Sequence, residues 1–168
     1  KGWIMAGREI SAGGVITTLL EMCFANTEGG MHVNLHSLAG NDIIKMLLAE
    51  NPGVVVQVSD KYKEEFKEYM EENGIGYAKI GYPTPAERTI VIKKDEYTHT
   101  FDIDALRDTW YKTSYLLDRD QSFNGCAAKR RDNYKKQPVE MQFHPSFKGS
   151  LESYDISADR RTDSRIKA

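Results

Sequence analysis

The feature that most constrains the fold of this chain is the stretch 15–24, which follows two glycines. Apolar side chains recur in it at helical spacing, at Val15, Ile16, Leu19, Leu20 and Cys23. Its polar side chains form a single narrow stripe, made of Thr17, Thr18 and Glu21. A helix with so little polar surface has to be buried on most sides. The pattern therefore predicts a buried helix that follows an N-cap at Ser11.

Length and charge narrow the class of protein and the kinds of partner that this chain can have. A chain of 168 residues fits one domain, and a domain of that size buries roughly 68–70% of its unfolded surface. The formal net charge of −2 argues against a nucleic-acid partner, because such proteins need an excess of Lys and Arg. No apolar run approaches the roughly 18 residues that span a bilayer, and 1–7 is too short for a signal-peptide core. We therefore expect neither nucleic acid nor membrane as a partner.

The cysteines and the chain ends bear on location and completeness. Cys23 and Cys126 show no pairing pattern, which suits a reducing compartment and predicts a cytoplasmic protein. The chain begins at Lys1 without an initiator Met, and 3–7 is interpreted as the end of a helix. No closing element is expected after 165–168. We expect a piece of a longer protein.

Periodicity along the rest of the chain predicts an α/β layered domain with a mixed sheet flanked by helices. Strands are expected at 31–35, 54–58, 75–80, 88–93 and 97–101, and helices at 41–50, at 60–73 and from Asp104 onward. The compact domain is expected to span 1–137, followed by an extended strap or linker over 138–168, where periodicity vanishes.

Some of these elements carry more specific expectations. The β-branched run 54–58 indicates a central strand buried on both faces, with 75–80 as its parallel neighbour across a helical crossover. Residues 82–85 are interpreted as a turn, and 88–101 as a hairpin. The Lys/Glu run of helix 60–73 is interpreted as a solvated face rather than a docking surface.

The local motif best suited to chemistry is Arg8-Glu9-Ile10-Ser11-Ala12-Gly13-Gly14, at the start of the buried helix. Two glycines allow an anion to approach the backbone closely, and the helix dipole with its unpaired N–H groups favours phosphate. Ser11 can cap the helix or donate its hydroxyl to a phosphate. Glu9 offers the hard oxygen that Mg²⁺ prefers beside nucleotide phosphates. The alternative is an ordinary capped helix start, with Arg8 and Glu9 in solvent; the spacing matches neither the P-loop nor the Rossmann motif.

Other candidate residues are weaker. Glu21 lies on the polar stripe, where it faces either this site or water. The only histidines with i, i+4 spacing are His32 and His36, which fall on a strand and its exit, so their rings are not expected to converge on a metal. Cys23 is interpreted as core packing. The basic segment 129–136 is interpreted as a solvated loop rather than a phosphate grip.

Motifs in order along the chain carry a family resemblance. The glycine motif is followed by Leu19-Leu20-Glu21-Met22-Cys23-Phe24-Ala25, then by Glu50-Asn51-Pro52-Gly53-Val54-Val55-Val56-Gln57-Val58-Ser59, Trp110-Tyr111-Lys112-Thr113-Ser114-Tyr115, Asn124-Gly125-Cys126-Ala127 and Asn133-Tyr134-Lys135. Together they resemble phosphoribosylformylglycinamidine synthase in its large single-chain form, the glutamine-dependent ligase of purine biosynthesis. The resemblance covers essentially the whole chain.

This resemblance implies both a fold and an activity. Residues 1–137 are similar to the C-terminal lobe of the synthetase core, a three-layer α/β/α unit with a mixed sheet that aminoimidazole ribonucleotide synthetase shares. Residues 138–168 are similar to the strap toward the glutaminase domain. The full enzyme phosphorylates the amide oxygen of formylglycinamide ribonucleotide with ATP and Mg²⁺, and ammonia from glutamine then displaces phosphate. The lobe before Lys1 and the glutaminase beyond Ala168 are the implied partners, and without them the fragment is expected to be inactive.

The resemblance also assigns the site residues and shows where this chain departs. The family motif usually reads His-Asp-x-Ser-Asp-Gly-Gly, in which the first acid ligates Mg²⁺ and the serine contacts the nucleotide. The matching positions are Glu9 for the metal and Ser11, Gly13 and Gly14 for the nucleotide. This chain has Arg8 for His, Glu9 for Asp and Ala12 for the second Asp. Large members of the family carry two such nucleotide sites, and the motif alone does not say which one this loop serves.

Two other functions are alternatives to this interpretation. One is a related ATP-dependent phosphotransferase of the selenophosphate synthetase or thiamine-monophosphate kinase type, although such chains usually end soon after the lobe. The other is a non-catalytic α/β regulatory module. A phosphate or nucleotide bound at Gly13 and Gly14 would argue against the module.

Overall fold

The computed structural model describes residues 1–136 and 149–150. The chain divides into two compact units, Lys1–Lys135 and Lys136–Ala168, and the description below concerns the first. The expected strap at 138–168 lies almost wholly outside the described residues. No described helix is both long and apolar enough to cross a membrane.

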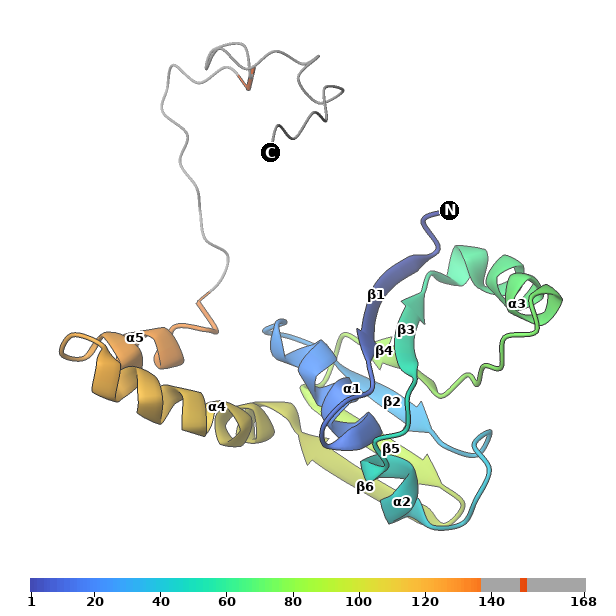
Figure 1. Ribbon diagram of the computed structural model, residues 1–168, viewed down its shortest axis with the longest axis horizontal. Helices are drawn as coiled ribbons and strands as arrows, with labels where there is room; N and C mark the ends of the chain where they lie inside the picture. Colours follow the sequence, from blue (N-terminus) through green and yellow to red (C-terminus); the bar gives the residue numbers. More distant parts are fainter. Residues whose placement is uncertain (137–148, 151–168) are drawn as a thin grey trace, which may run out of the picture. The chain divides into compact units, whose positions relative to one another are not determined.

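The centre of the first unit is a four-stranded mixed sheet, whose strands have the order β4-β2-β5-β6 (Figure 1). These strands are β2 (Gly30–Asn34), β4 (Gly81–Thr84), β5 (Thr89–Lys94) and β6 (Tyr97–Asp102). β2 runs parallel to β5, whereas the pairs β2–β4 and β5–β6 are antiparallel. The expected α/β class, the mixed sheet and the hairpin of β5 and β6 are thus confirmed. Between these two strands Asp95 adopts a positive φ of 51°, as residues of tight turns often do.

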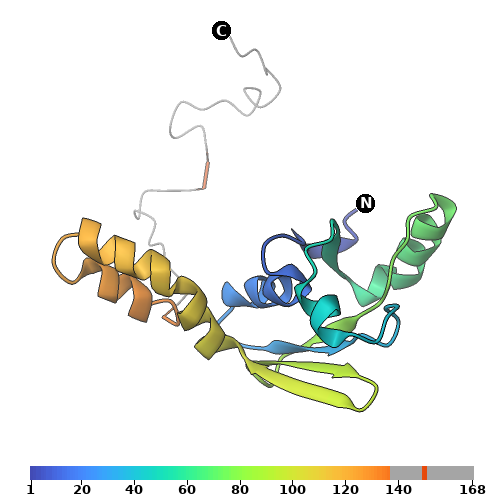
Figure 2. The same ribbon diagram turned by 60° about the horizontal axis from the view of Figure 1, so that its bottom comes forward.

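The buried helix α1 (Gly14–Phe24) lies on one face of this sheet, beside α2 (Ile43–Leu48) (Figure 2). The core forms between them: Leu35, Ile90 and Ile92 are fully buried, and Leu19 of α1 is only 3% exposed. Alternate residues of β5 point into this core, as the two-residue period of a strand requires. The opposite face of the sheet carries no helix of the described unit (Figure 2).

The N-terminal segment differs from its prediction. Residues 3–7 do not end a helix; they belong to a strand, β1 (Ile4–Glu9), which pairs antiparallel with β3 (Val54–Val58) in a separate two-stranded sheet. β3 is therefore not a central strand buried on both faces, and Val54 is 67% exposed. Its β-branched residues favour a strand but do not choose its partner, and here the partner is the start of the chain.

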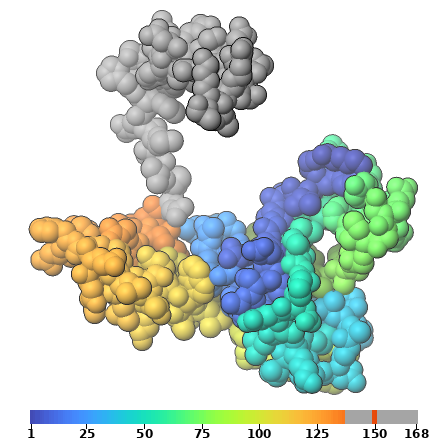
Figure 3. Space-filling view, viewed as in Figure 1, coloured from blue at the N-terminus to red at the C-terminus, as the bar shows by residue number. Residues whose placement is uncertain are grey.

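The segment after β3 also departs from expectation in part. The expected helix 60–73 is confirmed as a short 3₁₀ turn (Asp60–Tyr62) followed by α3 (Lys63–Glu72), with Gly74 beyond its end at φ +64°. Residues 75–80 are not a strand, and 82–84 are not a turn but part of β4. No residue of α3 is buried. Its Phe66 and Tyr69 instead pack against Trp3, whose ring lies 5.5 Å from that of Tyr69. In Figure 3 the dark-blue N-terminal end accordingly lies beside the green segment that forms α3.

The long helix α4 (Ile103–Gln121) and the short α5 (Cys126–Asp132) complete the unit. Asp102 caps α4 by accepting a hydrogen bond from the Ala105 N–H, so the helix begins one residue before the Asp104 that the sequence suggested. The basic segment 129–136 is not a solvated loop. It includes part of α5, and Arg130 makes an ion pair with Asp118.

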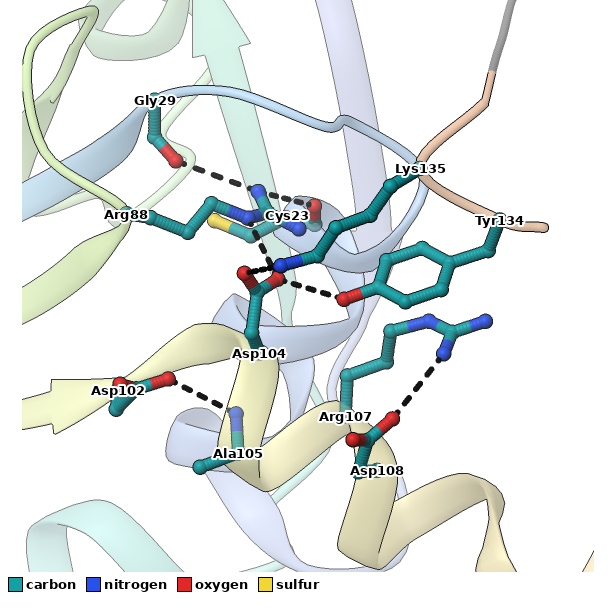
Figure 4. A network of polar contacts seen from close by, with 10 residues as sticks. All are labelled: Cys23, Gly29, Arg88, Asp102, Asp104, Ala105, Arg107, Asp108, Tyr134 and Lys135. Atoms are coloured by element: carbon teal, nitrogen blue, oxygen red, sulfur yellow. Dashed lines mark hydrogen bonds and ion pairs between the residues drawn. The ribbon is translucent and has the colours of Figure 1, made fainter. Parts of the chain in front are cut away.

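A polar cluster around Asp104 ties α4 to α1 and to residues after α5 (Figure 4). Arg88 donates from Nε to Asp104 at 3.0 Å and from Nη1 to the carbonyls of Cys23 and Gly29. Tyr134 donates to the same carboxylate at 2.9 Å, and Lys135 forms an ion pair with it. Desolvation would raise the pKa of Asp104, but the hydrogen bonds from Lys135, Tyr134 and Arg88 outweigh it and hold that pKa below its ordinary value.

We expect Asp104→Asn to lower the free energy of unfolding at pH 7 by about 1.5–3 kcal/mol, because Arg88, Tyr134 and Lys135 lose their charged acceptor. Since the folded-state pKa of Asp104 is lowered, its contribution is complete above the unfolded-state pKa of about 4 and is lost as the pH falls through the folded value. Urea unfolding at pH 7 and pH 3 measures both effects.

The control for this test is Asp108→Asn, because Asp108 is half exposed and has one contact, to Arg107 at 3.5 Å. Its effect should stay within about 0.5 kcal/mol. Equal losses in the two variants, or a difference between Asp104→Asn and the parent that does not shrink at pH 3, would contradict the role of Asp104.

Candidate functional site

The candidate site is the loop 10–13, which joins the end of β1 to the start of α1. Glu9 is the last residue of β1 and is exposed. Ile10 is held by a hydrogen bond from its N–H to the Gly53 carbonyl at 2.8 Å, and the Ser11 carbonyl accepts from the Gly14 N–H at 2.9 Å. The ribbon of β1 and β3 therefore fixes one end of the loop, and the first helical turn fixes the other.

Both glycines of the motif are required by the backbone. Gly13 and Gly14 have φ values of +84° and +71°, a region that residues with a Cβ rarely adopt. A Cβ on Gly14 would lie 2.6 Å from the Leu47 carbonyl oxygen, and one on Gly13 would lie 2.2 Å from Thr17 Oγ1. Gly14 is buried against the end of α2, whereas Gly13, directly before the first helical residue, is partly exposed.

The helix is not capped as predicted. Its N-cap is Gly13, which has no side chain of its own to make a cap hydrogen bond. Ser11 is exposed and lies two residues before the cap, so the expectation that it caps the helix is wrong. Its hydroxyl has no hydrogen bond within the described residues. The Ser11 hydroxyl, which the sequence assigned to a nucleotide ligand, thus takes no part in the hydrogen bonding of the described fold.

A carboxylate already lies at the helix start. Glu50, two residues after α2, accepts a hydrogen bond from the Gly13 N–H at 2.8 Å. This is the kind of contact that a phosphate oxygen makes at a helix N-terminus, and the positive end of the helix dipole favours any anion there. Sequence reasoning missed Glu50 as a site residue, because nothing in its neighbourhood indicates a contact 37 residues away.

Arg8 and Glu21 form a pair beside the loop. Arg8 Nε lies 2.6 Å from Glu21 Oε2, and Trp110 of α4 donates its indole N–H to Glu21 Oε1 at 3.0 Å. The Glu21 side chain is only 12% exposed. Of the two expectations for Glu21, the one that it faces the motif agrees with its contact to Arg8, whereas the one that it faces water does not. Both of its oxygens contact side chains of this chain. The arginine that replaces the usual family histidine holds this carboxylate.

The remaining predicted residue, Glu9, suits a metal carried by a nucleotide. Its carboxylate is exposed, with no ion pair among the described residues. No group of three or more His, Cys, Asp or Glu within 1–136 is placed to hold a metal. Mg²⁺ in nucleotide sites needs only one or two carboxylates, because phosphates and waters complete its octahedron. Glu9 and the carboxylate-binding helix start therefore fit a Mg²⁺–nucleotide, though not a protein-only metal site.

The histidines and cysteines take other roles. Cys23 is buried, which raises the pKa of its thiol, so its assignment to core packing agrees with its position. His36 pairs with Asp95 at 3.1 Å, and His32 stacks on Tyr82. Both histidines line one pocket, but each has a different partner, in agreement with the expectation that their rings do not converge on a metal.

We expect Gly14→Ala to destabilise the chain more than Gly74→Ala, which serves as the matched control. Both glycines have positive φ, but a Cβ on Gly74 meets nothing within 4 Å. Backbone strain alone costs roughly 1–2 kcal/mol, and the collision with the Leu47 carbonyl should add about 1–3 kcal/mol. Urea unfolding of the two variants measures the difference, and equal losses would show that the backbone contact between α1 and α2 is unimportant.

Comparisons with known proteins identify the family of this chain. Residues 1–94 match the family model described as AIR synthase related protein, C-terminal domain. A probable phosphoribosylformylglycinamidine synthase of Arabidopsis thaliana, assigned to chloroplast or mitochondrion, is 32% identical over 151 residues, which is 88% of this chain and 10% of that protein. The human phosphoribosylformylglycinamidine synthase is 26% identical over 80% of this chain and 10% of its own length. The chain thus spans about a tenth of these relatives.

The chain is also similar to a viral protein and to a solved structure. A probable membrane antigen 75 of Saimiriine herpesvirus 2 is 30% identical over 126 residues, covering 75% of this chain and 9% of the antigen. Among solved structures, PurL of Thermotoga maritima complexed with ATP matches with a TM-score of 0.54 and 15% identity, over 63% of this chain and 19% of that one. That likeness shows a shared fold. The family match and the relatives together establish that this chain belongs to the AIR synthase related proteins and is a relative of the phosphoribosylformylglycinamidine synthases.

Proposed function

We propose that this chain is part of a ligase that converts formylglycinamide ribonucleotide, ATP and glutamine to formylglycinamidine ribonucleotide, ADP, phosphate and glutamate. Its contribution is the start of α1, at which Glu9, Ser11, Gly13 and Gly14 hold a Mg²⁺–nucleotide. The observation that carries this proposal is the helix start itself, where the Gly13 N–H already binds a carboxylate oxygen at 2.8 Å. The names of the Arabidopsis and human relatives support the reaction.

Each residue has a separate task in this proposal. Gly13 leaves the backbone open, so that a phosphate oxygen can approach its N–H. Gly14, which is buried and donates its N–H to the Ser11 carbonyl, fixes the position of the helix start against α2. The Ser11 hydroxyl donates to a second phosphate oxygen. Glu9 supplies one oxygen to Mg²⁺, which offsets the negative charge of the phosphates. The solved relative that contains ATP supports a nucleotide as the ligand.

Glu50 has to leave Gly13 when the nucleotide binds, because both anions need the same N–H. A second carboxylate beside Glu9 would also be available to Mg²⁺ once it is released. We therefore include Glu50 in the proposed site, as the internal anion that occupies the helix start without ligand.

Catalysis needs the rest of the protein. Phosphoryl transfer depends on the positioning of groups from several elements, and the proposed partners are the N-terminal synthetase lobe and the glutaminase domain of the same chain. Residues 1–137 form the C-terminal lobe of the synthetase core in this proposal, and 138–168 lead to the glutaminase. A cytoplasmic location is part of it too, supported by the free thiols of Cys23 and Cys126.

A non-catalytic role is the second candidate. The herpesvirus antigen is 30% identical to this chain, so the domain also occurs in a protein named as an antigen. The occupied carboxylate Glu21 and the replacement of the family's second acid by Ala12 are compatible with this role. Retention of a nucleotide by the complete protein separates the two candidates.

We expect Glu9→Gln in the full-length protein to weaken Mg²⁺-dependent binding of ADP about tenfold, since a charged oxygen ligand becomes an amide. Gly13→Val should abolish binding, because a side chain fills the approach to the N–H groups. The matched control is Glu28→Gln, at an exposed glutamate beyond the other end of α1. Equilibrium dialysis with ADP and Mg²⁺ gives the three affinities, and unchanged binding in both site variants means that the loop is only a helix start.

We also expect the 168-residue chain by itself to form no amidine from formylglycinamide ribonucleotide, ATP and glutamine. The assay is chromatographic detection of the amidine, with the full-length protein as its positive control. Amidine formation by the isolated chain would contradict the proposal that catalysis needs the other domains.

A further inference from the structure

A pocket at the end of β2, away from the start of α1, has the chemistry of a second anion site. It has a volume of about 470 Å³ and lies between the β2 strand end, the following loop and the chain before β4. Its polar lining consists of His32, Asn34, His36, Ser37, Lys79, Tyr82 and Lys93. That volume lies within the range of small-ligand sites, which is about 300–1,000 Å³.

The walls of the pocket are fixed by hydrogen bonds. The Ser37 hydroxyl donates to the Lys79 carbonyl at 3.1 Å, and the Asn34 N–H donates to the Ile80 carbonyl at 2.6 Å. On the core side the buried Lys94 donates to the carbonyls of Leu35 and Leu38. These contacts tie the end of β2 and the loop after it to the chain before β4 and to Lys94 of β5.

The charge of the pocket is positive in a chain whose net charge is negative. Lys79 and Lys93 line it from two sides and are exposed, and within the described residues neither has an acidic partner. An acid also lies near the lining, since Asp95 pairs with His36. Two lysines that line one cavity without acidic partners among the described residues favour an anion there.

An aromatic surface adjoins these charges. The rings of His32 and Tyr82 stack at 5.6 Å, with only 9° between their planes. Tyr82 is nevertheless 60% exposed, so much of its side chain remains open to solvent. An open ring face beside cationic groups binds a planar base by stacking, which is worth about 1–3 kcal/mol per base in single-strand sites.

We propose that this pocket binds a nucleoside monophosphate, with its phosphate between Lys79 and Lys93 and its base on Tyr82. The site is independent of the proposed nucleotide site at Gly13 and needs neither Glu9 nor Mg²⁺. A longer nucleic acid is the less favoured occupant, because the overall charge of −2 opposes it.

The test is isothermal titration of the 168-residue chain with AMP, without Mg²⁺, and with inorganic phosphate and adenosine as separate probes. We expect AMP to bind more tightly than either part alone. The double variant Lys79→Gln/Lys93→Gln should weaken AMP binding by about tenfold or more, whereas Lys112→Gln, at an exposed lysine of α4, should leave it unchanged. Tyr82→Ala should weaken the binding of AMP but not that of phosphate.

Two comparisons separate this site from the one at the helix start. Gly13→Val should retain AMP binding, so that a loss confined to this variant would place the ligand at α1 and overturn the proposal. Undiminished AMP binding in the lysine double variant would overturn it as well, as would no binding in the parent. An RNA oligomer that binds far more tightly than AMP, and loses affinity in the lysine double variant, would replace the mononucleotide by a nucleic acid.

Discussion

The close contact between Gly14 and the end of α2 is the constraint on which the candidate site depends. A Cβ at Gly14 would lie within 3 Å of the backbone of both Leu47 and Leu48, so only glycine allows the two helices to approach this closely. The same approach brings Glu50, two residues beyond α2, to the Gly13 N–H. The packing of α1 on α2 therefore sets which anion reaches the helix start.

At the other end of α1, charged hydrogen bonds are added to the packing of Cys23 and Phe24. Arg88 donates a hydrogen bond to the Cys23 carbonyl near the helix C-terminus, where the dipole favours a cation. It donates a second hydrogen bond to Asp104 of α4. One Arg88 nitrogen, Nη2, is buried without a hydrogen-bond partner among the described residues. Leaving a buried donor unpaired costs about 1–3 kcal/mol, so the three contacts of the other two nitrogens have to outweigh that cost.

The sequence predicted the elements whose signal is local. The 3.6-residue period of α1 and the hairpin of β5 and β6 depend on neighbours a few residues apart, and both are confirmed. β1 was missed because its strand character comes from pairing with β3, about fifty residues away in sequence. The pairing of β3 was wrong for the same reason, since β-branched residues state a preference for a strand and not for a partner.

The same difference between local signals and long-range contacts applies to the candidate site. Gly13 and Gly14 were predicted to let an anion approach the backbone, which remains a proposal; their positive φ values, which require glycine, come from the structure. Ser11 was wrongly taken as the cap, since the positive φ of Gly13 shifts the helix start by two residues. The roles of Glu50 and of the Arg8–Glu21–Trp110 contacts depend on tertiary packing, and no spacing in the sequence indicates them. Glu9 remains a proposed ligand.

The most direct test of the proposed site is a crystal structure of the complete protein grown with Mg²⁺ and ADP. We expect a phosphate oxygen within hydrogen-bond distance of the Gly13 N–H, Glu50 displaced from that N–H, and Mg²⁺ about 2.0–2.1 Å from a Glu9 oxygen. Glu50 still bound to Gly13, with the nucleotide elsewhere in the protein, would contradict the assignment of this helix start as a nucleotide site.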